Sequence, residues 1–389
     1  MVDLSRLVKR ANGVKVDQAP EEPVWKGPIV DGITYSMLSR FLTCRERFRL
    51  AVIEGLRTAD TFNHKIEYGH MWHECERAVS AKKPWMQVLE EYYLKLLQKY
   101  KWQNISYEIR KWYMICRTQF PIYEKYWREH ADNQQRTPIA QEYNFCVDYP
   151  LDNGRVVKMR GKMDAFDLIG KPKSGEVDLQ ENKTKGDIDE ENIQKQLVMD
   201  CQTMFYLTAL YKLQQVPKKQ RTLLPAFYDT PIGGVRYNVI RRPLSGGKGN
   251  IKQHKATAKK PAESDEAFYS RLASIIDGTG LNRNGDETPG PAYFFMRWKA
   301  NILKQDVDHF NTVFLRPILH QLCNWYDWVS TCYQKGITPF SVDNTIHWQH
   351  PFGVDNMINE GFSHDMDEYL RTGSMIGLRR VEKLFEELD

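Results

Sequence analysis

The sequence predicts an α/β fold, because the spacing of its apolar residues changes from a helical period to a strand period near residue 139. From Thr34 and Ser36, which are candidate caps, to about Glu129, apolar residues recur at three- and four-residue steps, as on the buried face of a helix. The segments that follow are shorter, and turn sequences such as DNGR and GKPKSG separate them. Strands, one helix and then further strands are therefore expected to form a mixed sheet flanked by helices.

The segments of this core can be assigned individually. The first three strands are expected in IAQEYNFCVDYPL, VVKMRGKMDAFDLIG and GEVDLQENKTK. The helix is expected in ENIQKQLVMDCQTMFYLTALYKL, and two more strands in LLPAFYDTP and GVRYNVIRRPL, around a Gly-Gly turn.

The order of the segments predicts five regions along the chain. They are an extended arm at 1–32, a helical lobe at 33–135, the α/β core at 136–245, basic and Gly/Pro-rich loops at 246–292, and a C-terminal helical region at 293–389. The C-terminal region, in which helical spacing returns from Tyr293, is expected to pack on the core.

The composition predicts a soluble, cytoplasmic protein. No apolar stretch approaches the roughly 18 residues that a membrane span requires, and the N-terminus has no apolar signal-peptide core. The 7 cysteines are scattered without a CxxC pair, which is typical of reduced thiols rather than a disulfide framework. The 55 basic and 50 acidic residues leave a net charge of +5, which permits a polyanionic partner if the charge is clustered.

Glu181 and Lys183 lie two positions apart in an otherwise apolar strand. Both side chains should therefore point to the same face of the sheet. Asp164 is central in the preceding strand, and a hairpin between the two strands would bring it beside Glu181. Two converging carboxylates can bind a hard divalent ion such as Mg²⁺ or Mn²⁺. Asp167 is a weaker candidate than Asp164, because it points to the opposite face.

The helix after these strands adds two polar residues. Gln202 and Tyr206 are four residues apart and share a helix face, from which they can reach a nucleic-acid backbone or brace Lys183. Each feature has an ordinary explanation when it is taken singly. Glu181 and Lys183 can be a structural ion pair, and an aspartate in a strand is commonly an edge or turn residue. The order of the features along the chain is what indicates a catalytic site.

This order of motifs resembles the PD-(D/E)XK nuclease superfamily, and in particular its RecB-like exonuclease branch. GKMDAF, ENKTK and QTMFYLTAL are similar to three successive motifs of that branch. ITYSMLSRFLTCRERF is similar to its opening Ser-x-x-x-hydrophobic-Cys helix, with Ser36 as the serine. YGHMWHECE is similar to its Gly-x-x-x-His motif, and QEYNF to the segment whose glutamate, here Glu142, opens the first core strand. The resemblance covers residues 33–245.

The resemblance implies a restriction-endonuclease-like core and a metal-dependent deoxyribonuclease, an exonuclease acting in DNA recombination, repair or phage replication. It implies that His73, Asp164, Glu181 and the backbone carbonyl of Asn182 hold Mg²⁺ or Mn²⁺. Lys183 would orient the attacking water, and the product would carry a 5′-phosphate. Two alternatives stay open, namely a sequence- or structure-specific endonuclease of the same fold and a non-catalytic DNA-binding or scaffold subunit.

The sequence departs from that branch in two respects. Members with an iron–sulfur cluster combine the first cysteine, here Cys44, with three closely spaced C-terminal cysteines, but residues 340–361 contain none. No iron–sulfur cluster is therefore expected, and Cys44 should be a buried thiol. The chain also lacks a GxxxxGK[ST] motif, so unwinding would require another protein. Besides linear or single-stranded DNA ends, the candidate partners are a helicase, a recombinase or a single-strand-binding protein.

His70 is a rival of His73 as a metal ligand. The four-residue spacing from Gly69 favours His73, and a lone helical histidine such as His70 is usually structural.

The many aromatic residues of the helical lobe have two interpretations. At helical spacing they are expected to form the core, with one or two free to stack on unpaired bases.

The lysine-rich loop at 248–260 also has two readings. It is either an ordinary solvated loop or a finger that grasps phosphates. In the second case Lys248, Lys252 and Lys255 are the candidate DNA-binding residues.

Overall fold

The computed structural model describes residues 23–58, 60–131, 136–186, 200–244, 251–258, 260–280, 290–337 and 374–385, and the single residues 188, 195, 197, 339 and 388. Most of the predicted arm, Lys248 and the cysteine-free stretch 340–361 lie outside these residues. The chain divides into two compact units. The first comprises Met1–Asp60, Asn144–Gly161 and Asp308–Asp389, and the second comprises Thr61–Tyr143 and Lys162–Val307.

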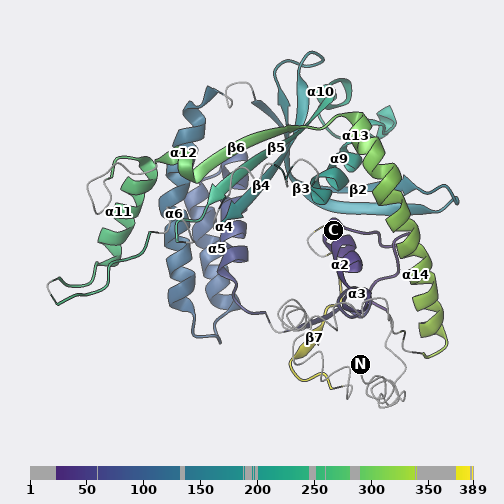
Figure 1. The fold of residues 1–389 in the computed structure, drawn as a ribbon, viewed down its shortest axis with the longest axis horizontal. Coiled ribbons are helices and arrows are strands. Elements are labelled where there is room, and N and C mark those ends of the chain that lie inside the picture. Colours follow the sequence, from purple (N-terminus) through teal and green to yellow (C-terminus); the bar gives the residue numbers. More distant parts are fainter. Residues whose placement is uncertain are drawn as a thin grey trace. The chain divides into compact units, whose positions relative to one another are not determined.

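The five-stranded sheet is mixed. It consists of β2 (Arg136–Pro150), β3 (Val156–Ile169), β4 (Glu176–Lys185), β5 (Ile232–Arg241) and β6 (Phe295–Asn301), in that spatial order (Figure 1). β3 and β4 pair antiparallel, β4 and β5 parallel, and β5 and β6 antiparallel. Parallel strands need a crossover connection, and helix α9 (Cys201–Gln214) lies in the one between β4 and β5. The predicted α/β fold, with a mixed sheet flanked by helices, is confirmed.

Two predictions for this sheet are wrong. LLPAFYDTP is not a strand, because it contains the short helix α10 (Pro225–Asp229), which has proline at its first position, where a missing N–H is tolerated. The segment after Tyr293 is not wholly helical, because it contains β6. β6 is an edge strand that pairs with β5 along one side.

The two glycines at the start of β5 do not form a turn. Gly234 lies inside the strand with a φ of +140°, and a Cβ atom on it would lie 2.1 Å from the carbonyl oxygen of Ala300 in β6. The pairing of β4 with β5 shifts register between Val177 and Asp178, next to this position. Glycine here allows a bulge and a close approach between strands.

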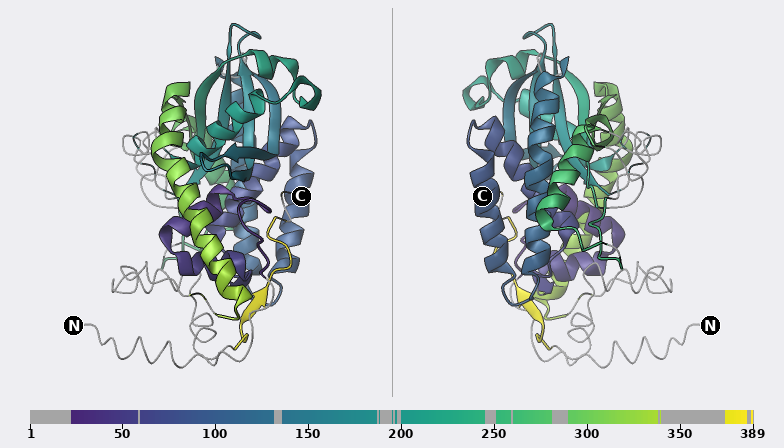
Figure 2. Two further views of the ribbon diagram at one scale, coloured as in Figure 1. Left: turned by 90° about the vertical axis from the view of Figure 1, so that its right-hand side faces the viewer. Right: turned by 90° about the vertical axis from the view of Figure 1, so that its left-hand side faces the viewer.

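The helices of the second unit enclose an aromatic core. α4 (His64–Ser80), α5 (Trp85–Lys99) and α6 (Ser106–Glu129) pack side by side, and α11 (Asp265–Asp277) packs on α6 (Figure 2). Shorter helices occur at η2 (Lys218–Gln220), α12 (Pro291–Phe294) and α13 (Lys304–Phe310). Buried aromatic residues of the lobe include Trp72, Tyr100, Trp112, Tyr113 and Trp127, whereas Trp102 is 87% exposed. The prediction that most of these residues form the core is confirmed.

The first unit contains the helix of the Ser-x-x-x-hydrophobic-Cys motif. Its elements are α2 (Tyr35–Thr43), α3 (Arg45–Phe48), the π-helix η1 (Arg49–Ile53), β1 (Leu56–Thr58), the π-helix η3 (Asn311–Leu315), α14 (Arg316–Gln334) and β7 (Leu378–Arg380). Thr34 caps α2 by accepting a hydrogen bond from the N–H of Met37 at 3.3 Å. Ser36 lies in the first turn, 3.0 Å from the Thr34 hydroxyl. Cys44 is a buried free thiol, as predicted.

A buried carboxylate ties α4 to α5. Glu67 on α4 accepts hydrogen bonds from the hydroxyl groups of Tyr92 at 2.8 Å and Tyr100 at 2.6 Å. The Nζ atom of Lys99 lies 3.3 Å from the same carboxylate. Burial alone would raise the pKa of Glu67, but its hydrogen bonds, first from His70 and then from the two tyrosines, together with the charge of Lys99, lower the pKa to about 2. The ionised carboxylate therefore stabilises the packing of these helices.

Glu67→Gln is expected to lower the free energy of unfolding at pH 7 by about 1–3 kcal/mol, because a hydrogen-bonded charge is lost. The folded pKa of Glu67 lies below its ordinary value of 4.5, so the contribution is fully present above that pH and disappears as the pH falls towards 2. Urea unfolding of both proteins across this range measures the effect, and the two stability curves should converge in acid. A constant difference at every pH would contradict the assigned charge.

Candidate metal centre

The hairpin of β3 and β4 places two acidic residues at directly opposed positions. Ala165 pairs with Gln180 in the antiparallel register, so Asp164 and Glu181 are neighbours one residue further along each strand. The backbone N–H of Asn182 donates a hydrogen bond to Oδ2 of Asp164 at 2.7 Å. Both neighbours of Glu181 are thus bound to β3, Gln180 by its pairing with Ala165 and Asn182 by its hydrogen bond to Asp164.

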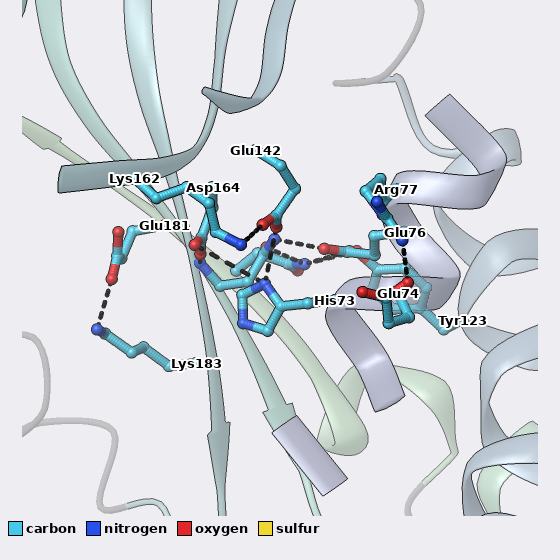
Figure 3. A network of polar contacts seen from close by, with 12 residues as sticks. His73, Glu74, Glu76, Arg77, Tyr123, Glu142, Lys162, Asp164, Glu181 and Lys183 are labelled. Atoms are coloured by element: carbon cyan, nitrogen blue, oxygen red, sulfur yellow. Dashed lines mark hydrogen bonds and ion pairs between the residues drawn. The ribbon is translucent and has the colours of Figure 1, made fainter. Parts of the chain in front are cut away.

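His73 and Glu142 approach Asp164 from two other elements. Nδ1 of His73, on α4, lies 3.4 Å from Oε1 of Glu142, on β2, and 3.7 Å from Oδ1 of Asp164 (Figure 3). One ligand atom from each of the three residues lies within 4.8 Å of the other two. One imidazole nitrogen and two carboxylate oxygens fit a divalent ion that prefers oxygen ligands, such as Mg²⁺ or Mn²⁺.

Glu142 has an unusual backbone conformation. Its φ is +47°, in the left-handed region, although it lies within a strand and carries a Cβ atom. Such a conformation costs about 1–3 kcal/mol and persists only where surrounding contacts maintain it. The carboxylate lies between His73 and Lys162, whose Nζ atom is 2.7 Å from Oε2. The strain is therefore located where a carboxylate is directed at the candidate metal centre.

Glu181 and Lys183 form an ion pair beside this group. Nζ of Lys183 lies 2.5 Å from Oε1 of Glu181 and donates a hydrogen bond to Oε1 of Gln202 at 3.0 Å. Gln202 in turn donates to the hydroxyl of Tyr206 at 3.2 Å. Glu181 is 2% exposed, and among the described residues its Oε2 atom has no hydrogen-bond partner. A buried carboxylate oxygen without a partner costs free energy, which a bound cation would offset.

The proximity of these acidic groups changes their proton affinity. Burial raises the pKa of Asp164, and burial together with the charge of Asp164 raises the pKa of Glu181. Burial opposes a charge on His73, but Asp164 and Glu142 outweigh burial and raise its pKa to about 9. A metal ligand must be a neutral imidazole, so binding of an ion at His73 is expected to release a proton near pH 7.

A second layer of polar residues supports the centre. Glu76, one turn after the histidine on α4, accepts hydrogen bonds from the side chains of Asn182 and Tyr123. Asn238 on β5 donates to Glu76 at 3.2 Å and to the side-chain oxygen of Asn182 at 3.0 Å. These contacts join α4 and α6 to β4 and β5. They also hold the residue whose backbone N–H binds Asp164.

The sequence patterns did not predict this second layer. Glu76 follows His73 by three residues, so the two side chains share a face of α4, and that spacing was a usable signal. Tyr123 and Asn238 come from distant segments, and no local period connects them with His73. Their meeting is a result of tertiary folding.

The remaining candidates lie elsewhere. His70 is 57% exposed and contacts Glu67 at 3.4 Å rather than the metal group. Asp167, on the opposite face of β3 from Asp164, pairs with Arg136 at 2.8 Å. Lys252 and Lys255 are exposed, and no contact joins them to the candidate centre within the described part of the chain.

The fold and this group of residues are those expected of a metal-dependent nuclease. The sequence model of the PD-(D/E)XK nuclease superfamily matches residues 33–288, more than half of the chain. The chain therefore belongs to the PD-(D/E)XK nuclease superfamily. No curated protein matches it with significant similarity. A nuclease of this superfamily acts on DNA with the help of divalent metal ions, and His73, Glu142 and Asp164 are a candidate site for such an ion.

Glu76→Ala is expected to lower the free energy of unfolding by about 2–4 kcal/mol, because the side-chain donors of Asn182 and Asn238 lose their shared acceptor. Tyr123→Phe removes the donor to Glu76 and an acceptor of Asn238 but leaves the carboxylate with both asparagines, so its expected loss is about 1–2 kcal/mol. Guanidinium chloride unfolding measures both variants. Equal losses would show that Glu76 contributes no more to stability than the hydroxyl of Tyr123.

Proposed function

We propose that this chain is a Mg²⁺- or Mn²⁺-dependent deoxyribonuclease, and that it is an exonuclease of the RecB-like type. The observation that carries the proposal is the convergence of His73, Glu142 and Asp164 beside the Glu181–Lys183 pair. The exonuclease assignment rests on the resemblance of the sequence motifs to the RecB-like branch. Recombination, repair or phage replication would be its setting.

Several residues would coordinate the ion jointly. His73, Asp164, Glu181 and the carbonyl of Asn182 are the proposed ligands, and the proximity of Glu142 to His73 supports its addition to this set. When bound, the ion polarises the scissile phosphate and lowers the pKa of a bound water. The buried, unpaired oxygen of Glu181 supports its place among the ligands, although its other oxygen contacts Lys183.

Lys183 would position the attacking water and offset charge on the transition state. Burial alone would lower its pKa, but Glu181 and Asp164 outweigh burial and raise the pKa, so the amine stays protonated at neutral pH. A protonated amine can donate hydrogen bonds but cannot accept a proton, so we assign it an electrostatic role rather than that of a general base. The contacts of Gln202 with Lys183 and Tyr206 favour bracing of the lysine over binding of DNA.

The proposed substrate is linear or single-stranded DNA in the cytoplasm. Lys252 and Lys255 are exposed and are candidates for phosphate contacts, with Lys248 of the same loop. A helicase, a recombinase or a single-strand-binding protein would be the partner that supplies unwound ends. Among the helices that the structure describes, none is long and apolar enough to cross a membrane.

Two other functions can be separated from this one. A sequence- or structure-specific endonuclease would use the same chemistry on internal sites, whereas a scaffold subunit would bind DNA without cleaving it. The presence of Asp164, Glu181 and Lys183 together disfavours the scaffold. Digestion of end-labelled linear, circular and single-stranded DNA in Mg²⁺, Mn²⁺ or EDTA distinguishes the three. Cleavage of circular DNA would favour the endonuclease, and no cleavage under any condition would favour the scaffold.

Asp164→Ala and His73→Ala are each expected to lower the rate of DNA cleavage by ~100-fold or more, because each removes a ligand of the ion. His70→Ala is the matched control, since His70 lies on the same helix and its side chain is 57% exposed. This control should cleave like the wild type. End-labelled linear DNA measures the rate, and thermal melting shows that each variant is folded. Full activity of folded Asp164→Ala would overturn the assignment.

Lys183→Arg tests the catalytic role of the lysine. An ion-pair partner of Glu181 should tolerate arginine, whereas a group that positions a water should not, since the guanidinium is planar and bulkier. We expect the cleavage rate to fall by ~100-fold or more. DNA affinity in Ca²⁺, which fills the site without supporting cleavage, should change little. Normal cleavage by this variant would favour a purely structural lysine.

A further inference from the structure

The first unit contains a cluster of arginines from four elements. This arginine cluster consists of Arg40 on α2, Arg47 on α3, Arg57 on β1 and Arg379 on β7. In the antiparallel ribbon of β1 and β7, Arg57 pairs directly with Arg379. Side chains of directly opposed residues lie on the same face, and like charges at such positions destabilise a sheet. The ribbon therefore carries a repulsion that its fold does not require.

The electrostatic effect of this arrangement extends to α2. Burial, and then the charges of Arg40 and Arg379, lower the pKa of Arg57 to about 10, although the charge of Asp60 opposes this change. Burial and the charge of Arg47 lower the pKa of Arg40. Burial is the larger cause of both changes, and the neighbouring positive charges add to it.

The neighbouring glutamates do not balance this charge. Glu46 and Glu54 both contact the buried guanidinium of Arg49. The hydroxyl of Tyr333 also donates a hydrogen bond to Glu54 at 2.7 Å. These two carboxylates are therefore occupied within the core of the unit. Asp60 does pair with the cluster, at 2.8 Å from Arg379.

Two arginines of the cluster, Arg57 and Arg40, have no carboxylate contact among the described residues. Arg57 donates hydrogen bonds to the backbone carbonyl groups of Leu56, at 2.9 Å, and Ala51. These neutral acceptors fix the guanidinium but do not neutralise it. The guanidinium of Arg40 has no hydrogen bond or ion pair within the residues that the structure describes. A half-buried guanidinium without a partner is costly unless an anion binds beside it.

We propose that the arginine cluster binds the phosphodiester backbone of a nucleic-acid strand. The guanidinium group is a planar fork that matches the oxygens of a phosphate, and a phosphate near Arg40, Arg57 and Arg379 would relieve their repulsion. Such contacts would hold the strand irrespective of its sequence. The choice of nucleic acid as the ligand rests on the proposed nuclease function. The expectation that some anion binds the cluster rests only on the positions of the arginines.

Four variants test the cluster. Arg40→Gln and Arg379→Gln each remove one charge, and Arg40→Lys keeps the charge at the same position. Arg155→Gln is the matched control, because Arg155 lies in the same unit and its charge is paired with Asp327 at 2.7 Å. Fluorescence anisotropy in Ca²⁺ measures the affinity of each protein for labelled single-stranded and duplex DNA over a series of salt concentrations.

Each glutamine variant of the cluster should raise the Kd about 3- to 10-fold and reduce the slope of log K against log salt by about 1. Arg40→Lys and the Arg155 control should keep the slope of the wild type. Unchanged affinity and slope in both cluster variants would overturn the proposal. The binding measurement does not depend on cleavage. If the wild type never cleaves DNA, the proposed nuclease function is wrong, but the proposal that the arginine cluster binds DNA is still tested by the affinities.

Thermal melting separates binding from a structural role. Relief of repulsion should raise the Tm of Arg40→Gln by ~1–2 °C, whereas Arg379→Gln should change the Tm little because it also loses the pair with Asp60. DNA should stabilise the wild type more than either variant. Arg379 is 57% exposed, so its replacement is not expected to disturb the core. Weaker DNA binding that comes only with a lower Tm in both variants would show that the arginines are structural.

Discussion

The antiparallel register of β3 and β4 is the constraint on which the candidate metal centre depends. It places Asp164 beside Glu181, and a slip of one residue would send one of the two carboxylates to the opposite face of the sheet. The N–H of Asn182, bound to Asp164, ties the strands together at this point. Lys183 then falls on the same face as Glu181, where the first turn of α9 supplies Gln202.

Helix α4 links this hairpin to the helical core, because it contributes residues to both. Its inner face carries Trp72 into the aromatic core, and its next face carries His73 and Glu76 to the strands. The position of His73 therefore depends on packing that involves α5 and α6, although neither helix contributes a proposed ligand. Tyr123 on α6 takes part directly, since it shares Glu76 with the asparagines of β4 and β5.

Groups of like charge gather in both units, with opposite sign. At the candidate metal centre, carboxylates gather in a partly buried place, where Lys162, Lys183 and the imidazole of His73, whose pKa is raised to about 9, compensate them. In the first unit, arginines gather while the nearby glutamates are occupied by Arg49. We propose that each group is compensated further by a bound ligand of the opposite charge, a divalent ion at the carboxylates and a phosphate at the arginines.

The sequence by itself determined which residues share a face, because the strand period of two and the helix spacing of three or four are local properties. That was sufficient for the α/β fold class and for grouping Glu181 with Lys183. It was not sufficient for the parallel pairing of β5, for the edge strand β6, or for the left-handed backbone of Glu142. Nor could it join Glu76 to Asn238, which lies on a strand far along the chain. Only the tertiary structure decided these features, because the free energy that selects them comes from contacts between segments that no local pattern records.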